Sequence, residues 1–253
     1  MTFIASLILL GEVSAALAAP VRHYERTNSD GTEMERVVVF ARSPAQVEVF
    51  KGRNRCADAA WVTGLLDPET GQAVELIGGR LTPELTQHRI ATLARDNDGV
   101  LALKLDRNGA DASFSARVGE RWVLYDFDFA DLIAHPPEQI LRREDLRFEL
   151  PHLMLGDAPS FTNRGELTLT FAGEMPRGGH HALLYLAGGP ALAGAQGRFW
   201  FDAADGRLIE ARLPIPNHAE YQDFVLKLVR EEQGEEAWQA LLAEHWRDCP
   251  VSP

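Results

Sequence analysis

Hydrophobic and polar residues alternate in short runs along most of this chain, and turn-forming residues separate the runs. In residues 46–51, Val47 and Val49 fall on one face of an extended segment while Glu48 falls on the other. Alternation with a period of two is typical of a β-strand that is buried on one side. Further strands are predicted at residues 34–41, 72–77, 88–93, 100–105, 113–118, 122–127, 146–150, 166–172, 181–187, 197–201, 208–213 and 223–229.

Sequences that favour tight turns connect several of these predicted strands. Residues 66–71 read Leu-Asp-Pro-Glu-Thr-Gly, in which the proline presets φ and Gly71 accepts a positive φ. The Asp-Asn-Asp-Gly run at 96–99 and the Arg-Asn-Gly run at 107–109 are typical of hairpin connections. Strands joined in this way predict an antiparallel meander, most clearly in the last third of the chain.

Helical patterns are rare in the chain and are best developed near its C-terminus. A helix is predicted at residues 235–247, where Trp238, Leu241 and His245 recur on one face at helical spacing. A second, short helix is predicted at residues 130–135, and two prolines end it. A further helical turn is expected directly after these prolines.

The order of these elements predicts the fold class. Turn-rich strands without interleaved helices exclude a doubly wound α/β fold. The pattern predicts a mainly β protein with a large antiparallel sheet that curls into a half-barrel or barrel, and with one C-terminal helix that covers an opening or an edge. Residues 20–253 are expected to form a single β-rich domain, and residues 151–161 are the candidate sub-boundary within it.

The first nineteen residues have the layout of a secretory signal peptide. Residues 4–10 are apolar except for Ser6, and Ala16 and Ala18 occupy the positions of small residues before a signal-peptidase cut. The segment lacks a positively charged start and contains Glu12, so an amphipathic or buried N-terminal helix is the alternative interpretation. The prediction is that residues 1–19 are removed and that the protein is periplasmic or secreted, in a cell envelope of the Gram-negative type.

Cys56 and Cys249 are the only cysteines. Two cysteines in an exported chain predict one disulfide, whereas two free thiols would be expected in the cytosol. A Cys56–Cys249 bond would close a loop of nearly the whole mature chain, and the chain-entropy model assigns such a loop roughly 5 kcal/mol. It would pin the C-terminal segment onto the N-terminal part of the sheet.

Charge and missing motifs narrow the function. The formal net charge is −12, and an acidic protein is repelled by phosphate backbones, so nucleic acid is not an expected partner. The sequence contains no Gly-x-Ser-x-Gly elbow, no His-Glu-x-x-His helix and no phosphate-binding loop that ends in Gly-Lys-Ser/Thr. No cofactor and no metal site are predicted, and no segment of the mature chain is long and apolar enough to cross a membrane.

The densest acidic group consists of Asp126, Asp128 and Asp131, followed by His135. If residues 122–127 form a strand, alternation places Asp126 and Asp128 on one face and the aromatic residues between them on the other. Two carboxylates on one face can share a proton or bind a hard cation. Asp126, Asp128 and His135 are therefore the candidate catalytic residues. The alternative is that the aromatic face is core and the aspartates are its solvated side.

The last quarter of the chain resembles uncharacterised exported bacterial proteins related to the DUF3108 family. The resemblance is carried by residues 198–202, 205–209, 216–218 and 238–249, which read RFWFD, DGRLI, PNH and the helix from Trp238 to Cys249. It implies a periplasmic curved β-sheet and no established catalytic residues.

Three functions follow as hypotheses. The leading one is a non-catalytic envelope protein whose curved sheet binds a lipid-like, apolar or amphipathic ligand, or a protein partner. The second is an envelope hydrolase that uses the carboxylates of Asp126 and Asp128. The third is a structural or assembly factor, in which the alternating basic residues Lys51, Arg53 and Arg55 bind another chain; a solvated edge strand is the preferred interpretation of this stripe.

Overall fold

Fourteen antiparallel strands, arranged as two meanders, form one continuous sheet in the computed structural model, which describes residues 19–106, 111–155 and 158–250. The first meander consists of β1 (Pro20–Thr27), β2 (Glu35–Ser43), β3 (Gln46–Gly52), β4 (Ala60–Leu66), β5 (Ala73–Leu81), β6 (Gln87–Arg95), β7 (Val100–Leu105) and β8 (Ala112–Arg117). The second consists of β9 (Leu146–Met154), β10 (Ser160–Arg177), β11 (His180–Gly188), β12 (Gly197–Asp202), β13 (Leu208–Leu213) and β14 (Phe224–Gln233).

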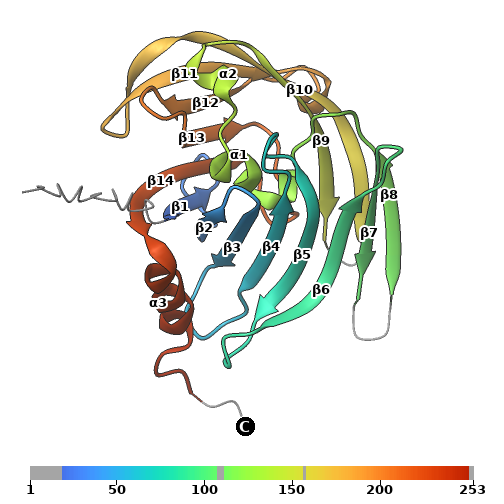
Figure 1. Ribbon diagram of the computed structural model, residues 1–253, viewed down its shortest axis with the longest axis vertical. Coiled ribbons are helices and arrows are strands. Elements are labelled where there is room, and N and C mark those ends of the chain that lie inside the picture. Colours follow the sequence, from blue (N-terminus) through green and yellow to red (C-terminus); the bar gives the residue numbers. More distant parts are fainter. Residues whose placement is uncertain (1–18, 107–110, 156–157, 251–253) are drawn as a thin grey trace, which may run out of the picture.

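The two meanders meet where the first and last strands pair. β1 lies between β2 and β14, so the sheet runs outward from this centre to β8 at one edge and to β9 at the other. The sheet curls until the two edges approach each other, which produces a nearly closed barrel (Figure 1). The expected mainly β fold, with a curled antiparallel sheet and one C-terminal helix, is confirmed.

Side-chain bonds connect the two edges of the sheet. The Asn163 Nδ2 atom on β10 donates to the carbonyl oxygen of Arg117 on β8 at 2.9 Å. The backbone N–H of Gly119 donates to the Glu149 carboxylate on β9 at 3.0 Å. Trp122 also forms an isolated bridge to Glu149. These polar contacts occupy groups that an open sheet edge would otherwise leave available to another chain.

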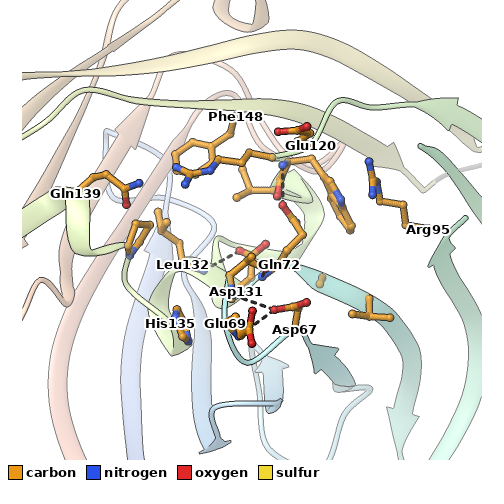
Figure 2. A pocket seen from close by; sticks show the side chains of 18 of the residues that line it. Asp67, Glu69, Gln72, Arg95, Glu120, Asp131, Leu132, His135, Gln139 and Phe148 are labelled. Carbon is orange, nitrogen blue, oxygen red and sulfur yellow. Dashed lines mark hydrogen bonds between the residues drawn. The ribbon is translucent and has the colours of Figure 1, made fainter. Parts of the chain in front are cut away.

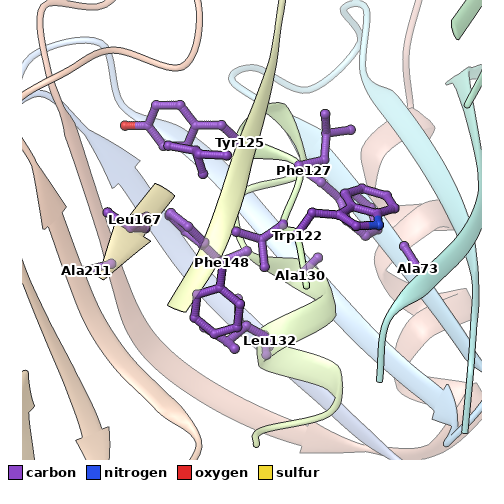
Figure 3. Packing of buried hydrophobic residues seen from close by; sticks show 14 of the residues in the cluster. Ala73, Trp122, Tyr125, Phe127, Ala130, Leu132, Phe148, Leu167 and Ala211 are labelled. Carbon is purple, nitrogen blue, oxygen red and sulfur yellow. The ribbon is translucent and has the colours of Figure 1, made fainter. Parts of the chain in front are cut away.

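The connection between β8 and β9 lies inside the barrel. This inner segment, residues 118–145, contains the 3₁₀ turn η1 (Tyr125–Phe127) and the short helices α1 (Ala130–Ala134) and α2 (Glu138–Leu141). Most of its apolar side chains are buried against inward-facing residues of the sheet (Figure 3), and Leu141 is an exception at 41% exposure. The buried apolar residues of the segment are Val118, Trp122, Val123, Leu124, Tyr125, Phe127, Phe129, Ala130, Leu132, Ile133 and Ile140. The described chain thus fills the middle of its own barrel.

The inner segment corrects one prediction. Residues 122–127 were expected to be a strand, but they form a single β-bridge followed by η1. Asp128 and Phe129 come next, with left-handed φ values of 52° and 59°. This double reversal sends Phe129 into the core, where its ring lies 5.1 Å from Phe199 and 5.6 Å from Phe224. Alternating aromatic residues in a tight turn had imitated the period of a strand.

Helix α3 (Gly234–Trp246) covers the outer face of the sheet. On β2, Val37 and Val39 face the barrel interior, whereas Val38 and Phe40 pack against α3. The ring of Phe40 stacks on Trp238 with centroids 5.6 Å apart. The helix therefore gives the central strands a second core on their outer side, which explains why both faces of β2 are apolar.

The expected disulfide between Cys56 and Cys249 is present, and it joins residues 193 positions apart. It fixes the end of α3 beside the chain between β3 and β4. There the Cys56 N–H also donates to the His245 carbonyl, and His245 Nε2 donates to the Ala57 carbonyl at 2.7 Å. The proposed signal segment and the expected turn at residues 107–109 lie wholly or mostly outside the described residues. Strands on both sides of residues 151–161 belong to the same sheet.

Replacing both cysteines, as Cys56→Ser with Cys249→Ser, should lower the free energy of unfolding by about 2–4 kcal/mol, because the unfolded chain regains the freedom of a long loop. Urea unfolding of the oxidised wild type and the double variant measures this difference. Reduced wild type is the matched control and should behave like the variant. Equal stabilities of all three samples would contradict the expectation.

Candidate functional site

The first candidate region is a buried cluster of charged and amide side chains, which we call the charge cluster: Lys51, Asp128, Asn217 and Arg26. Lys51 on β3 and Asp128 on the inner segment form an ion pair at 2.5 Å, and both are at least 95% buried. Asn217 Nδ2 donates to Asp128 Oδ1 at 2.7 Å. Burial alone would lower the pKa of Lys51, but the carboxylates of Asp128 and Asp126 outweigh it and raise the pKa above its ordinary value.

The charge cluster continues through Asn217 into the sheet. Arg26 on β1 donates to the side-chain oxygen of Asn217, and its guanidinium stacks on the ring of Tyr221. His152 on β9 donates from Nε2 to the Asn217 carbonyl at 3.1 Å, and burial lowers the pKa of this histidine. Asn217 thus joins two strands, β1 and β9, to the inner segment. This bonding pattern holds the inner segment in place.

The three catalytic candidates do not come together. Asp128 is about 1% exposed, and both its carboxylate oxygens face the charge cluster. Asp126 lies at the rim of the cluster, where its carboxylate is 3.1 Å from His218 Nε2. His135 lines a separate pocket, described below, to which neither aspartate contributes. The proximity of His218 to Asp126 was not foreseen, because 92 positions separate the two residues.

The predicted basic stripe is also divided. Lys51 points into the barrel to Asp128, whereas it had been expected beside Arg53 and Arg55. Arg53 pairs with Glu33 and lies 3.3 Å from Glu220, and Arg55 is 3.3 Å from Glu244 of α3. A continuous stripe of unpaired cations is therefore absent from these positions. The alternating residues of β3 were correctly predicted to form a strand. No local sequence pattern indicates that Lys51 is buried, because its partner Asp128 lies 77 positions away.

The second candidate region is a pocket of about 840 Å³, which we call the mouth pocket (Figure 2). Its lining is drawn from residues 67–74, 95–97, 120–123 and 131–142, together with Phe148. The turns between β4 and β5 and between β6 and β7 contribute one part, and the inner segment contributes the rest. The lining combines acidic and basic side chains with the apolar surfaces of Trp122, Leu132 and Phe148.

The β4–β5 turn is held rigidly at this pocket. The Asp67 carboxylate accepts hydrogen bonds from the N–H groups of Glu69 and Thr70, both at 2.9 Å, and these bonds lower the pKa of Asp67. Gly71 has a φ of +69°, and a Cβ there would lie 2.7 Å from the His135 side chain. Only glycine therefore fits this close contact between the turn and the inner segment.

Asp131 is the most unusual ionisable group of the mouth pocket. It lies in α1, one turn before His135, and both line the pocket, as helical spacing implies. Asp131 is about 3% exposed, and its Oδ1 atom accepts a hydrogen bond from the Leu132 N–H at 2.8 Å. Burial raises the pKa of Asp131 to about 7, so the carboxyl group changes its charge near neutral pH.

Trp122 forms one wall of the mouth pocket. Gln72 fixes it with two bonds, since Gln72 Nε2 donates to the Trp122 carbonyl at 2.7 Å and the Trp122 N–H donates to Gln72 Oε1 at 3.0 Å. The indole is about 2% exposed, and its Nε1–H has no hydrogen-bond partner among the described residues. A buried donor without a partner is uncommon in folded proteins.

The charge cluster is thus a structural anchor, whereas the mouth pocket is a cavity of about 840 Å³ lined by side chains that the fold leaves facing it. Asp131 was predicted to belong to the same acidic group as Asp126 and Asp128. Only the folded structure shows that it alone of the three lines the mouth pocket. Within the described ranges, no three His, Cys, Asp or Glu side chains are arranged to hold a metal ion. In the same part of the chain, no helix has both the length and the apolar composition to cross a membrane.

Comparison with protein-family models gives no match, and comparison with curated proteins gives none either. The resemblance of residues 198–249 to exported β-sheet proteins therefore stays an expectation. A functional proposal therefore rests on the geometry of the charge cluster and the mouth pocket.

Breaking the charge cluster on one side should destabilise the protein strongly. Asp128→Asn leaves Lys51 buried without its ion-pair partner and is expected to cost about 3–5 kcal/mol of unfolding free energy. The double variant with Lys51→Met removes both charges and should recover part of this loss. Arg142→Gln, at an exposed ion pair with Glu138, is the control and should cost less than about 1 kcal/mol. Chemical unfolding measures all three, and an Asp128→Asn variant as stable as this control would contradict the assignment.

Asp131 should make stability depend on pH. Its pKa is raised from 3.8 to about 7 in the folded chain, so folding favours the protonated carboxyl and stability falls as pH rises from about 4 to 7. The full cost above pH 7 is on the order of 4 kcal/mol. Asp131→Asn should therefore gain stability over wild type progressively between pH 4 and 8 in urea unfolding. Parallel pH profiles of the two proteins would show that Asp131 is not the titrating group.

Proposed function

We propose that this protein is an exported, non-catalytic binding protein of the cell envelope, and that it takes an amphipathic small molecule in the mouth pocket. The observation that supports this proposal best is the pocket itself. Its volume of about 840 Å³ lies within the range of about 300–1,000 Å³ that is usual for small-molecule sites. Most of the lining is charged or polar, and Trp122, Leu132 and Phe148 add apolar surface, which suits a ligand with both characters.

The barrel interior supports this location for the ligand. A curved sheet can carry an apolar ligand in its hollow, but here the aromatic residues of the inner segment occupy that space. Tyr125 and Tyr185 use their hydroxyl groups to bond backbone carbonyls of Ile215 and Ile140, at 2.5 and 3.0 Å. These bonds tie the inner segment to the sheet. The mouth pocket therefore offers room for a ligand that the filled interior does not.

Export is supported by two features of the chain. The first strand begins at Pro20, directly after the segment that has the layout of a signal peptide. The disulfide joins the loop after β3 to the end of α3, and such bonds persist mainly in oxidising compartments. The proposal therefore includes removal of residues 1–19 and a periplasmic or secreted location.

The other two functions have less support. A hydrolase based on Asp126 and Asp128 would need a carboxylate that faces a substrate, and Asp128 instead bonds Lys51 and Asn217. The half-buried pair of Asp126 and His218 is the observation that keeps this function as a second proposal. An assembly role through the basic stripe is weakened, because Lys51, Arg53 and Arg55 all pair with carboxylates of the same chain.

Native mass spectrometry of protein purified gently from the cell envelope tests the main proposal. We expect a chain that starts near residue 20 and carries an additional non-covalent mass. Val74→Trp places a bulky side chain at the pocket lining and should reduce the bound fraction, because Val74 is 44% exposed there. Val229→Trp is the matched control, since Val229 is 47% exposed on β14 and does not line the pocket. A ligand-free mass for all three proteins, with no loss of stability after solvent extraction, would contradict binding, and a chain that still starts at Met1 would contradict export.

A further inference from the structure

Asp131 is a buried acid without a cationic partner. Only about 3% of it is exposed, and the Leu132 N–H is its one neighbouring-residue hydrogen-bond donor, at 2.8 Å. No lysine, arginine or histidine of the described chain pairs with it: burial raises its pKa and only backbone hydrogen bonds oppose that rise. Buried carboxyl groups in folded proteins are normally paired. The missing partner is therefore a feature of the pocket that the fold itself does not explain.

Two of the three arginines that line the mouth pocket bond other groups of the chain, and the third, Arg121, forms no ion pair among the described residues. Arg142 pairs with Glu138 and Glu144, at 3.0 and 3.1 Å. Arg95 donates to the Gly119 carbonyl at 3.1 Å, near the junction of the two sheet edges. In Figure 2, Arg95 lies on the side away from Asp131, whereas Asp67 and Glu69 lie on the same side as Asp131. His135 also lies on this side (Figure 2), and within the described ranges no lysine or arginine forms an ion pair with Asp67, Glu69 or Asp131.

The aromatic lining suits the same kind of ligand. Trp122 and Phe148 line the pocket, at about 2% and 6% exposure. Indole faces attract cations more strongly than other aromatic side chains do, and the attraction grows when water is excluded.

We propose that the mouth pocket binds small organic cations, and that the Asp131 carboxylate recognises their ammonium group. This inference rests on the proposed function and names the ligand class for the same site. The ammonium group would supply the counter-charge that Asp131 lacks. The apolar part of the ligand would pack on Trp122 and Phe148. A neutral analogue offers the packing alone, so the charge is what the pocket selects.

Three probes of similar shape separate charge from packing: phenethylamine, 2-phenylethanol and 3-phenylpropionate. Isothermal titration at pH 8 should show that wild type binds the amine at least about tenfold more tightly than the alcohol, as expected for a hydrogen bond to a charged group. Asp131→Asn should bring the amine to within about threefold of the alcohol, for the same reason. Asp58→Asn is the matched control, because Asp58 is an exposed carboxylate that does not line the pocket; it should keep the preference of wild type.

The outcomes distinguish the two proposals. Equal binding of amine and alcohol by wild type, or an amine preference that survives Asp131→Asn, overturns recognition of a cation by Asp131 while leaving a binding pocket. Failure of wild type to bind any probe overturns the cation inference, and a ligand-free native mass would then remove the proposed function as well. Circular dichroism checks the fold of each variant. If Asp131→Asn does not fold, the comparison of the three probes on wild type still decides.

Discussion

The fold depends on the contact between the inner segment and the wall of the barrel, at whose centre lies the buried ion pair of Lys51 and Asp128. An unpaired buried charge is costly, so this pair fixes where the inner segment can lie against β3. Phe129, which directly follows Asp128, packs against Phe199 and Phe224. Both Asp128 and Phe129 have left-handed backbone, which non-glycine residues adopt only when their surroundings enforce it. The ion pair of Asp128 and the aromatic packing of Phe129 therefore stabilise the change of chain direction at these two residues.

The same reversal connects the filled core to the mouth pocket. Helix α1 begins directly after Phe129, so it places Asp131 at the pocket while Ile133 remains in the core. Trp122, on the other side of η1, forms another wall. The segment that excludes a ligand from the barrel interior therefore builds much of the site at its mouth. The inner segment thus contributes both to the packed core and to the lining of the mouth pocket. A substitution that loosens its packing is therefore expected to change the pocket as well.

Local periodicity explains what the sequence could predict. Most strands, helix α3 and the disulfide followed from alternation, helical spacing and cysteine count. Strands β1 and β4 were missed. On β1, His23 and Arg26 are buried with partners that lie far away in the sequence. Residues 122–127 were predicted as a strand because aromatic residues alternate there, although the chain turns. Lys51 was expected to be exposed, but it is buried with Asp128. That Asp131 is buried without a cationic partner follows from tertiary contacts, which no local pattern shows.

The central claim is that the barrel is filled by its own chain. Hydrogen exchange of the native protein tests it most directly, because the amides of Phe127 and Ile133 are bonded within the inner segment, to Leu124 and Phe129 carbonyls. Exchange of these amides should be as slow as that of the central strands β1 and β14, since opening the segment would break the charge cluster and the aromatic core. Exchange at the rate of exposed turns, with the strands still protected, would contradict a filled barrel.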